Sequence, residues 1–169
     1  MYTDEEITSI YNHYVDTVYR ISLMILKRCA EAEDATSTVF IKLLTAKTNF
    51  ESEEHLKAWL IVTAQNTCKD MLKNRWFRRR VDYDSIEEPS YLPDTLTKEI
   101  WEEIVTLDEK YKLPIYLHYY EGYKTEEIAK MLHINHATVR TRLRTARKKL
   151  KLLLKFEEEE VKYDPKRCD

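Results

Sequence analysis

Glycine, cysteine and proline are all scarce in this chain. Its 169 residues include one glycine, four prolines and three cysteines. A single glycine leaves no glycine-rich loop to cradle a phosphate, which excludes the common nucleotide-binding motifs. Cys29, Cys68 and Cys168 are odd in number and far apart, so they do not favour a disulfide framework, and we expect a reducing, cytoplasmic setting.

Long apolar runs and clusters of reactive residues are also lacking. No stretch approaches the roughly 20 apolar residues that span a bilayer, and no signal-peptide pattern opens the chain, so we expect no membrane insertion. The five histidines show no metal-ligand spacing with the cysteines, so we expect no metal and no cofactor. No nucleophile–base constellation or carboxylate pair is recognisable, and we expect no enzymatic activity.

What the chain does have is charge, divided sharply between segments. The formal net charge is only −2, yet residues 69–80 carry six basic and one acidic side chain, and residues 136–155 carry eight basic and none acidic. Residues 82–109 hold ten acidic residues and one basic residue. Two cationic segments on a slightly acidic protein indicate two separate phosphate contacts rather than a diffuse nucleic-acid coat.

Residues 125–155 are the most informative part of the sequence. Thr125 is expected to cap a first helix and Asn135 a second, with a short turn between them. In the second helix one apolar face repeats at three- and four-residue steps, through Val139, Leu143, Ala146, Leu150 and Leu153. Two helices, a tight turn and a basic second helix predict a helix-turn-helix, whose second helix can enter a DNA major groove. The alternative is an ordinary solvated helix hairpin, although solvated faces normally mix signs of charge.

The composition and the pattern predict an all-α protein of two small helical domains joined by a flexible acidic linker. We expect a first domain at 1–80, a linker at 81–95, a helix-turn-helix domain at 96–156 and an acidic tail at 157–169.

The first domain is predicted to contain three helices. The first carries a stripe from Ile7 to Ile21 that includes Tyr11, the second runs from about Ala32 to Ala46, and the third starts near Glu53. The third helix ends in the basic run 69–80, where Trp76 and Phe77 could stack on unpaired bases. Packing in the core or at a hinge is an equally open role for these two aromatic residues.

Three blocks of the chain resemble regions two and four of bacterial sigma factors, in the correct order. They are CAEAEDATSTVFIKLL, HLKAWLIVTAQNTCKDMLKNRWFRR and LDEKYKLPIYLHYYEGYKTEEIAKMLHINHATVRTRLRTARKKL. The nearest group is the extracytoplasmic-function (ECF) type, which keeps only those two regions. The resemblance covers about residues 5–80 and 96–154 and implies binding to core RNA polymerase and to promoter DNA.

The resemblance implies a polymerase-binding segment on the second helix. In the family this segment reads acidic-x-x-Gln-Glu-x-Phe; here Asp34 and Phe40 match, but Ser37 and Thr38 replace Gln and Glu. The departure bears on the strength of polymerase binding.

The resemblance also implies that the third helix reads and melts the downstream promoter element. Loop 47–55 would help to cradle a flipped base, which requires a pocket and nearby cations. The residues expected to contact this element are Asn66, Lys69, Lys73, Asn74, Arg75 and Trp76.

The helix-turn-helix would read the upstream element. Leu107–Gly122 resembles the helix pair that precedes it, with Pro114 expected to kink or divide a helix and Gly122 expected to take a left-handed capping conformation. The residues expected to contact bases or phosphates are Asn135, His136, Ala137, Thr138, Arg140, Thr141, Arg142, Arg144 and Arg147.

The predicted function is that of a sigma factor directing promoter-specific transcription initiation. Two alternatives remain: a stand-alone helix-turn-helix regulator, and a degenerate sigma-like protein with weak polymerase binding. The family resemblance further implies a possible anti-sigma partner linked to the membrane.

Overall fold

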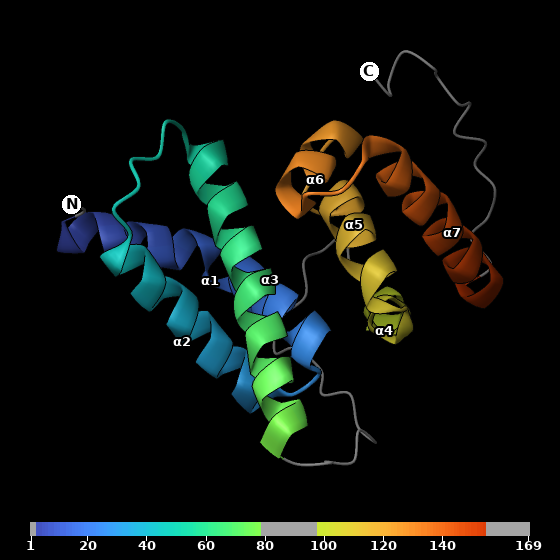
Figure 1. The fold of residues 1–169 in the computed structure, drawn as a ribbon, viewed down its shortest axis with the longest axis horizontal. Coiled ribbons are helices and arrows are strands. Elements are labelled where there is room, and N and C mark those ends of the chain that lie inside the picture. Colours follow the sequence, from blue (N-terminus) through green and yellow to red (C-terminus); the bar gives the residue numbers. More distant parts are fainter. Residues whose placement is uncertain (1–2, 79–97, 155–169) are drawn as a thin grey trace. The chain divides into compact units, whose positions relative to one another are not determined.

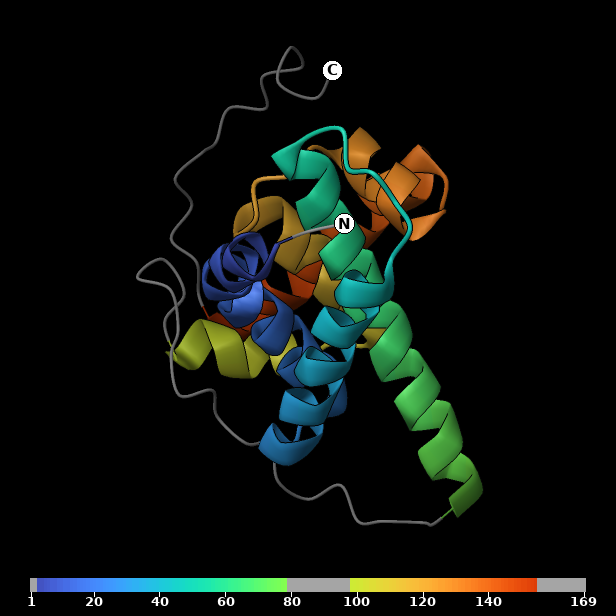
Figure 2. The same cartoon turned by 90° about the vertical axis from the view of Figure 1, so that its left-hand side faces the viewer.

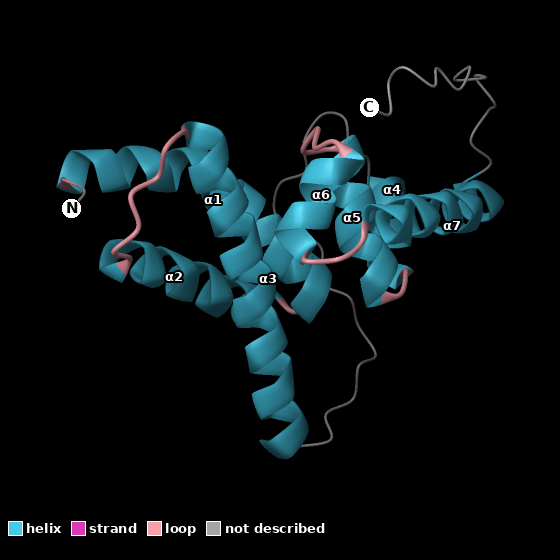
Figure 3. Cartoon of the chain, turned by 45° about the horizontal axis from the view of Figure 1, so that its top comes forward, coloured by secondary structure: helices cyan, strands magenta, loops and turns pink. Residues whose placement is uncertain are grey.

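The computed structural model describes residues 3–78 and 98–154, and the described backbone forms seven α-helices and no strand (Figure 1, Figure 3). The predicted all-α fold is therefore confirmed. The chain divides into two compact units, Met1–Tyr91 and Leu92–Asp169. The predicted linker 81–95 and tail 157–169 lie outside the described residues. No helix in the described ranges is long and apolar enough to cross a membrane.

Unit 1 is a bundle of three helices: α1 (Asp4–Leu26), α2 (Cys29–Thr45) and α3 (Glu53–Arg78), each packed against the other two. The α1 helix begins with a reciprocal cap, in which the Glu6 N–H donates to the Thr3 hydroxyl and the Thr3 N–H donates to the Glu6 carboxylate at 2.8 Å. The C-terminal end of α3 extends past α1 and α2 (Figure 2). That end carries the basic residues predicted to meet DNA.

The core of unit 1 departs from the predicted pattern in two places. Tyr11, expected to face inward, is 44% exposed, whereas the end of α1 from Arg20 to Leu26 is buried on all sides. The second helix begins at Cys29, three residues before the predicted Ala32, because Arg28 is extended and can precede a helix. The core is completed mainly by Val18, Ile21, Met24, Ala35, Val39, Leu43, Leu60, Ile61 and Ala64.

Unit 2 contains α4 (Lys98–Thr106), α5 (Glu109–Tyr119), α6 (Thr125–Leu132) and α7 (His136–Leu154). The prediction of two helices within Leu107–Gly122 is wrong, since that stretch holds only α5 and its partner α4 precedes it. Buried side chains from all four helices meet in one core, formed by Trp101, Ile104, Leu113, Tyr116, Leu117, Ile128, Val139, Leu143, Ala146 and Leu150.

A proline lies inside α5 and a glycine follows its end. Pro114 lies inside the helix without dividing it and is buried, so packing offsets the one backbone hydrogen bond that a proline cannot make. Gly122 adopts a φ of 76°, and the following N–H of Tyr123 returns to the Leu117 carbonyl at 3.0 Å. The left-handed conformation predicted for Gly122 is confirmed.

Candidate nucleic-acid interface

The turn between α6 and α7 is fixed by contacts at both helix starts. The Asn135 side chain accepts a hydrogen bond from the Ala137 N–H at 2.8 Å, which confirms Asn135 as the cap of α7. Thr125 is not the cap of α6, contrary to the prediction. Lys124 takes that position because its N–H donates to the Glu127 carboxylate at 2.7 Å, and Thr125 instead contacts His136 Nε2 at 2.7 Å. His136 thus joins the first turns of the two helices.

The exposed face of α7 carries four of the nine residues predicted to contact the upstream element. Ala137, Arg140, Thr141 and Arg144 are exposed and fall at steps of three, one and three residues along the helix, and exposed Lys148 follows four residues later. We call these five residues the reading face. The α7 sequence contains no Asp or Glu, so no charge of the helix itself opposes a polyanion. Such a face can insert into a major groove with its N-terminal residues at the base edges.

Other predicted residues lie on the flanks of α7. Thr138 and Arg142 are half-buried on one side, next to the buried stripe. Arg147 is exposed three residues after Arg144, and its Nη1 donates to the hydroxyl of Tyr119 on α5 at 3.3 Å.

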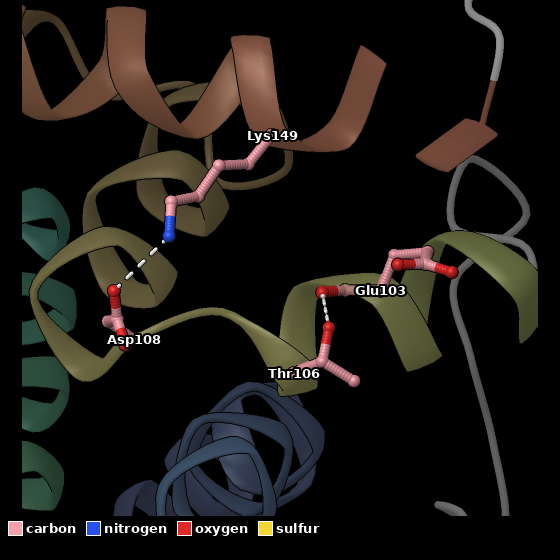
Figure 4. A network of polar contacts seen from close by, with 4 residues as sticks. All are labelled: Glu103, Thr106, Asp108 and Lys149. Carbon is pink, nitrogen blue, oxygen red and sulfur yellow. Dashed lines mark hydrogen bonds and ion pairs between the residues drawn. The ribbon is translucent and has the colours of Figure 1, made fainter. Parts of the chain in front are cut away.

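Lys149 on α7 is exposed but contacts residues of its own unit. Its Nζ lies 3.4 Å from the Asp108 carboxylate (Figure 4). The same Nζ lies 5.3 Å from the centre of the Tyr111 ring. Nearby, the Thr106 hydroxyl donates to the Glu103 carbonyl at 2.7 Å and closes the end of α4. Lys149 therefore fastens α7 to the start of α5.

The residues predicted to meet the downstream element share one face of α3. Asn66, Lys69, Lys73 and Asn74 are all exposed and fall at steps of three, four and one residue along the helix. Asp70 interrupts the row and lies 4.0 Å from Lys73, an exposed pair of little energetic weight. The side chains of Arg75 and Trp76 are outside the described part of the chain.

A cavity of about 440 Å³ opens between α1 and the loop that precedes α3. Its walls include the aromatic rings of His13, Tyr14 and Phe50 and the carboxylate of Glu53. The Tyr14 hydroxyl donates to Glu53 at 2.9 Å, and burial together with this bond raises the pKa of Tyr14 to about 12. The Phe50 ring meets Trp59 edge-on at 5.5 Å and so links the loop to the exposed side of α3.

The predicted polymerase-binding residues do not all reach the surface. Asp34 and Ser37 are exposed and Thr38 is half-buried, but Phe40 is buried and packs against Tyr11 with ring centres 4.8 Å apart. The exposed row through Asp34 and Ser37 continues into two apolar side chains, Ile41 and Leu44, which are 60% and 54% exposed. We call the row Asp34, Ser37, Ile41 and Leu44 the α2 face.

Sequence reasoning overlooked several residues that the structure brings to these surfaces. Ile41 and Leu44 extend the spacing of Asp34 and Ser37 at helical steps, a signal that the sequence did contain. Phe50 and Tyr119 carried no such signal, because each depends on a contact with a distant part of the chain. Among the residues described, no group of three or more His, Cys, Asp or Glu side chains could hold a metal ion.

Comparison with known proteins assigns both units. Residues 10–78 match the family described as Sigma-70 region 2, and residues 97–150 match Sigma-70, region 4. The chain is 25% identical to the ECF RNA polymerase sigma factor SigX of Bacillus subtilis, over 98% of this chain and 92% of SigX. It is 29% identical to RNA polymerase sigma factor SigV of the same organism, over 90% of this chain and 92% of SigV.

A solved structure shares the fold. It is the sigma factor RpoE of Bartonella quintana, in complex with the anti-sigma factor NepR, with a TM-score of 0.72, 18% identity, and coverage of 89% of this chain and 97% of the other. The two family matches occur in the order region 2, region 4, and SigX and SigV each align over 92% of their own length. The chain therefore belongs to the sigma-70 family and is a sigma factor of the extracytoplasmic-function type, a class that binds RNA polymerase and directs transcription initiation at promoters.

Proposed function

We propose that the two units divide promoter recognition between them. Unit 2 reads the upstream element through the reading face of α7, and unit 1 opens and holds the downstream element. The reading face carries this proposal, because it combines a capped helix start with a row of cations that no acid of the helix interrupts. The protein itself contributes binding and no chemistry, since RNA synthesis belongs to the polymerase.

In unit 1 the proposed path of the DNA follows α3. The exposed amide and lysine side chains of Asn66, Lys69 and Lys73 suit a phosphate backbone, which needs donors and cations at close intervals. The cavity beside Phe50 is the proposed seat of a base flipped out of the melted strand. Its aromatic walls can stack on a base, and Glu53 can accept a hydrogen bond from an amino group.

The α2 face is the proposed contact with core polymerase. Ser37 and Thr38 supply shorter polar side chains than the Gln and Glu that the family places there. Ile41 and Leu44 offset this loss, because apolar surface removed from water contributes roughly 25 cal/mol per Å². Phe40 contributes indirectly, because its buried ring packs against Tyr11 and holds α2 on α1.

A charge placed on the α2 face tests that contact. Ile41→Asp is expected to weaken binding to core polymerase at least about tenfold, because a carboxylate would have to lose its water in an apolar interface. Its stability should stay within about 0.5 kcal/mol of the original, since the side chain is exposed. Asn12→Asp adds the same charge on exposed α1 and serves as the control. Equal polymerase affinity for both variants would remove the α2 face from the interface.

The experiment that tests the whole proposal is run-off transcription with core polymerase and a library of genomic promoter fragments, with and without this protein. New start sites that share two spaced sequence elements support a promoter-reading sigma factor. DNA binding without polymerase and without new starts favours a stand-alone regulator. If neither appears, the Ser37→Gln/Thr38→Glu double variant separates weak docking from lost function: recovered transcription identifies docking as the defect.

The proposed regulator of this protein is an anti-sigma factor, linked to the membrane, that covers the α2 face. The motivation is the exposed apolar pair Ile41 and Leu44, together with the complex in which the RpoE structure was solved. Affinity purification of the tagged chain from its native cells, followed by transcription assays with the recovered partner, tests this. A partner that binds without suppressing transcription would contradict the proposal.

A further inference from the structure

We propose that Tyr119 is a positioning residue for DNA binding, which holds Arg147 so that its guanidinium meets a phosphate at the edge of the groove. The inference rests on the proposed function of α7. Tyr119 comes from α5, outside the helix-turn-helix, and is 50% exposed, so burial does not explain a large aromatic side chain there. Its hydroxyl accepts a hydrogen bond from Arg147 Nη1 at 3.3 Å.

The position of Arg147 along α7 points to a phosphate and not to a base. At 1.5 Å per residue, Arg147 lies about 15 Å along the helix axis from Ala137, whereas a major groove is about 12 Å wide. Arg144 lies only about 10 Å from Ala137 by the same measure, within the groove width. When the start of α7 faces the base edges, Arg147 is therefore carried to the sugar–phosphate strand.

The chemistry of the Tyr119 hydroxyl suits this role. It is a neutral group, so it fixes the direction of the arginine without cancelling its charge. The guanidinium has five N–H donors and gives one to Tyr119, which leaves the others for phosphate oxygens. Lys149 shows the opposite arrangement, because its partner Asp108 is a carboxylate and neutralises the cation locally.

Holding the arginine in advance should raise affinity by reducing the side-chain freedom that binding removes. Tyr119 is not required to touch the DNA for this effect. The neighbouring His118 ring meets the Tyr119 ring edge-on at 4.9 Å, which limits the directions the phenol can take.

A double-mutant cycle in the full chain tests the inference. The probe is a fluorescent duplex of mixed sequence, whose affinity is measured by anisotropy at several salt concentrations. Tyr119→Phe is expected to weaken binding about threefold to tenfold, the range for one ordinary hydrogen bond, with the salt dependence unchanged. Arg147→Gln should weaken binding further and lower the salt slope by about one phosphate contact.

The decisive value is the effect of Tyr119→Phe in the Arg147→Gln background. No further loss there means that the tyrosine acts through the arginine. An equal loss in both backgrounds, or no loss in either, overturns the inference. Tyr111→Phe removes a hydroxyl from the same helix and is the control, expected to bind as the original does. If the unaltered chain binds no duplex at all, alone or with core polymerase, it is the proposed function of α7 that fails.

Discussion

Three residues of the described chain have a positive φ, and only one of them is glycine. Gly122 has a φ of 76°, while Lys27 and His133 take 62° and 52°. Lys27 ends α1, and His133 ends α6 in the turn that leads to α7. Left-handed conformations cost a residue with a Cβ roughly 1–2 kcal/mol, so the two non-glycine positions are strained and the glycine is not.

Two substitutions in unit 2 should therefore change stability in opposite directions. Gly122→Ala is expected to lower the free energy of unfolding by about 1 kcal/mol, and since an added Cβ would meet no atom within 4 Å, the cause is backbone strain alone. His133→Gly should raise it by about 0.5 kcal/mol, after the entropy of glycine is subtracted. Urea unfolding followed by circular dichroism measures both. Equal signs for the two changes would contradict the assignment of strain.

The buried hydroxyl of Tyr14 should make the stability of unit 1 depend on alkaline pH. Tyr14→Phe is expected to cost about 1 kcal/mol at pH 7, since it removes the bond to Glu53. The pKa of Tyr14 is about 12 in the folded chain, and an unfolded tyrosine ionises near pH 10. The extra free energy of unfolding of the unaltered chain over Tyr14→Phe is therefore complete below pH 10 and is lost as pH rises through 12. Unfolding curves of both proteins between pH 7 and pH 11 test this. A difference that grows with pH would contradict it.

At the scale of single helices, α7 shows that neighbouring cations have different roles. Lys148 belongs to the reading face, whereas Lys149 lies between Asp108 and the Tyr111 ring. Charge content alone treats the two as equivalent. Their directions follow from the helical period, which rotates adjacent side chains by about 100°.

Alanine at each position separates these roles. Lys148→Ala is expected to lower the salt slope of DNA binding by about 0.9, the value for one lost phosphate contact. Lys149→Ala should leave the slope nearly unchanged, and should instead destabilise unit 2 by at most about 1 kcal/mol, as an exposed ion pair does. Anisotropy titrations at several salt concentrations distinguish the two. The same change in salt slope for both variants would show that the contact with Asp108 does not keep Lys149 from binding a phosphate.

Much of unit 2 was predictable from sequence because the signals are local. Asn135 as a cap, Gly122 as a left-handed residue and the buried face of Val139, Leu143 and Ala146 all depend on neighbours within one or two turns. The all-α fold follows from the same periodicity.

The parts that sequence did not predict depend on contacts between distant segments. The sequence predicts Thr125 as a helix cap. In the structure the Lys124 N–H donates to the Glu127 carboxylate, and the Thr125 hydroxyl contacts His136 instead. Tyr11 fits an inward stripe, yet it lies at the margin of the bundle over Phe40. The tether from Tyr119 to Arg147 spans 28 residues, and no pattern in the sequence indicates it.

At the scale of the whole molecule, the two surfaces that we propose for DNA binding differ in design. One is a helix face for a duplex groove, and the other joins a cationic helix row to a base-sized cavity. Each alone would bind weakly, and their connection in one chain raises the effective concentration of the second once the first is bound.

A promoter should therefore respond to the distance between its two elements. Inserting about five base pairs turns one element by half a helical turn relative to the other and should reduce transcription at least about tenfold. Inserting a full turn of about ten base pairs places both elements on the same side of the duplex again but increases the distance between them. This template is the matched control. A regulator that reads the upstream element alone would be indifferent to both insertions, so equal transcription from all three templates would contradict two-site recognition.

The reading face also has a consequence for the protein when it is not bound to DNA. Arg140, Arg144 and Lys148 stand four residues apart in succession, and each such like-charged pair costs an isolated helix about 0.2–0.5 kcal/mol. Phosphates remove this repulsion, and any ligand that binds only the folded chain stabilises it further. A protease that captures transiently unfolded chains would then be expected to degrade chains free of DNA faster than DNA-bound chains.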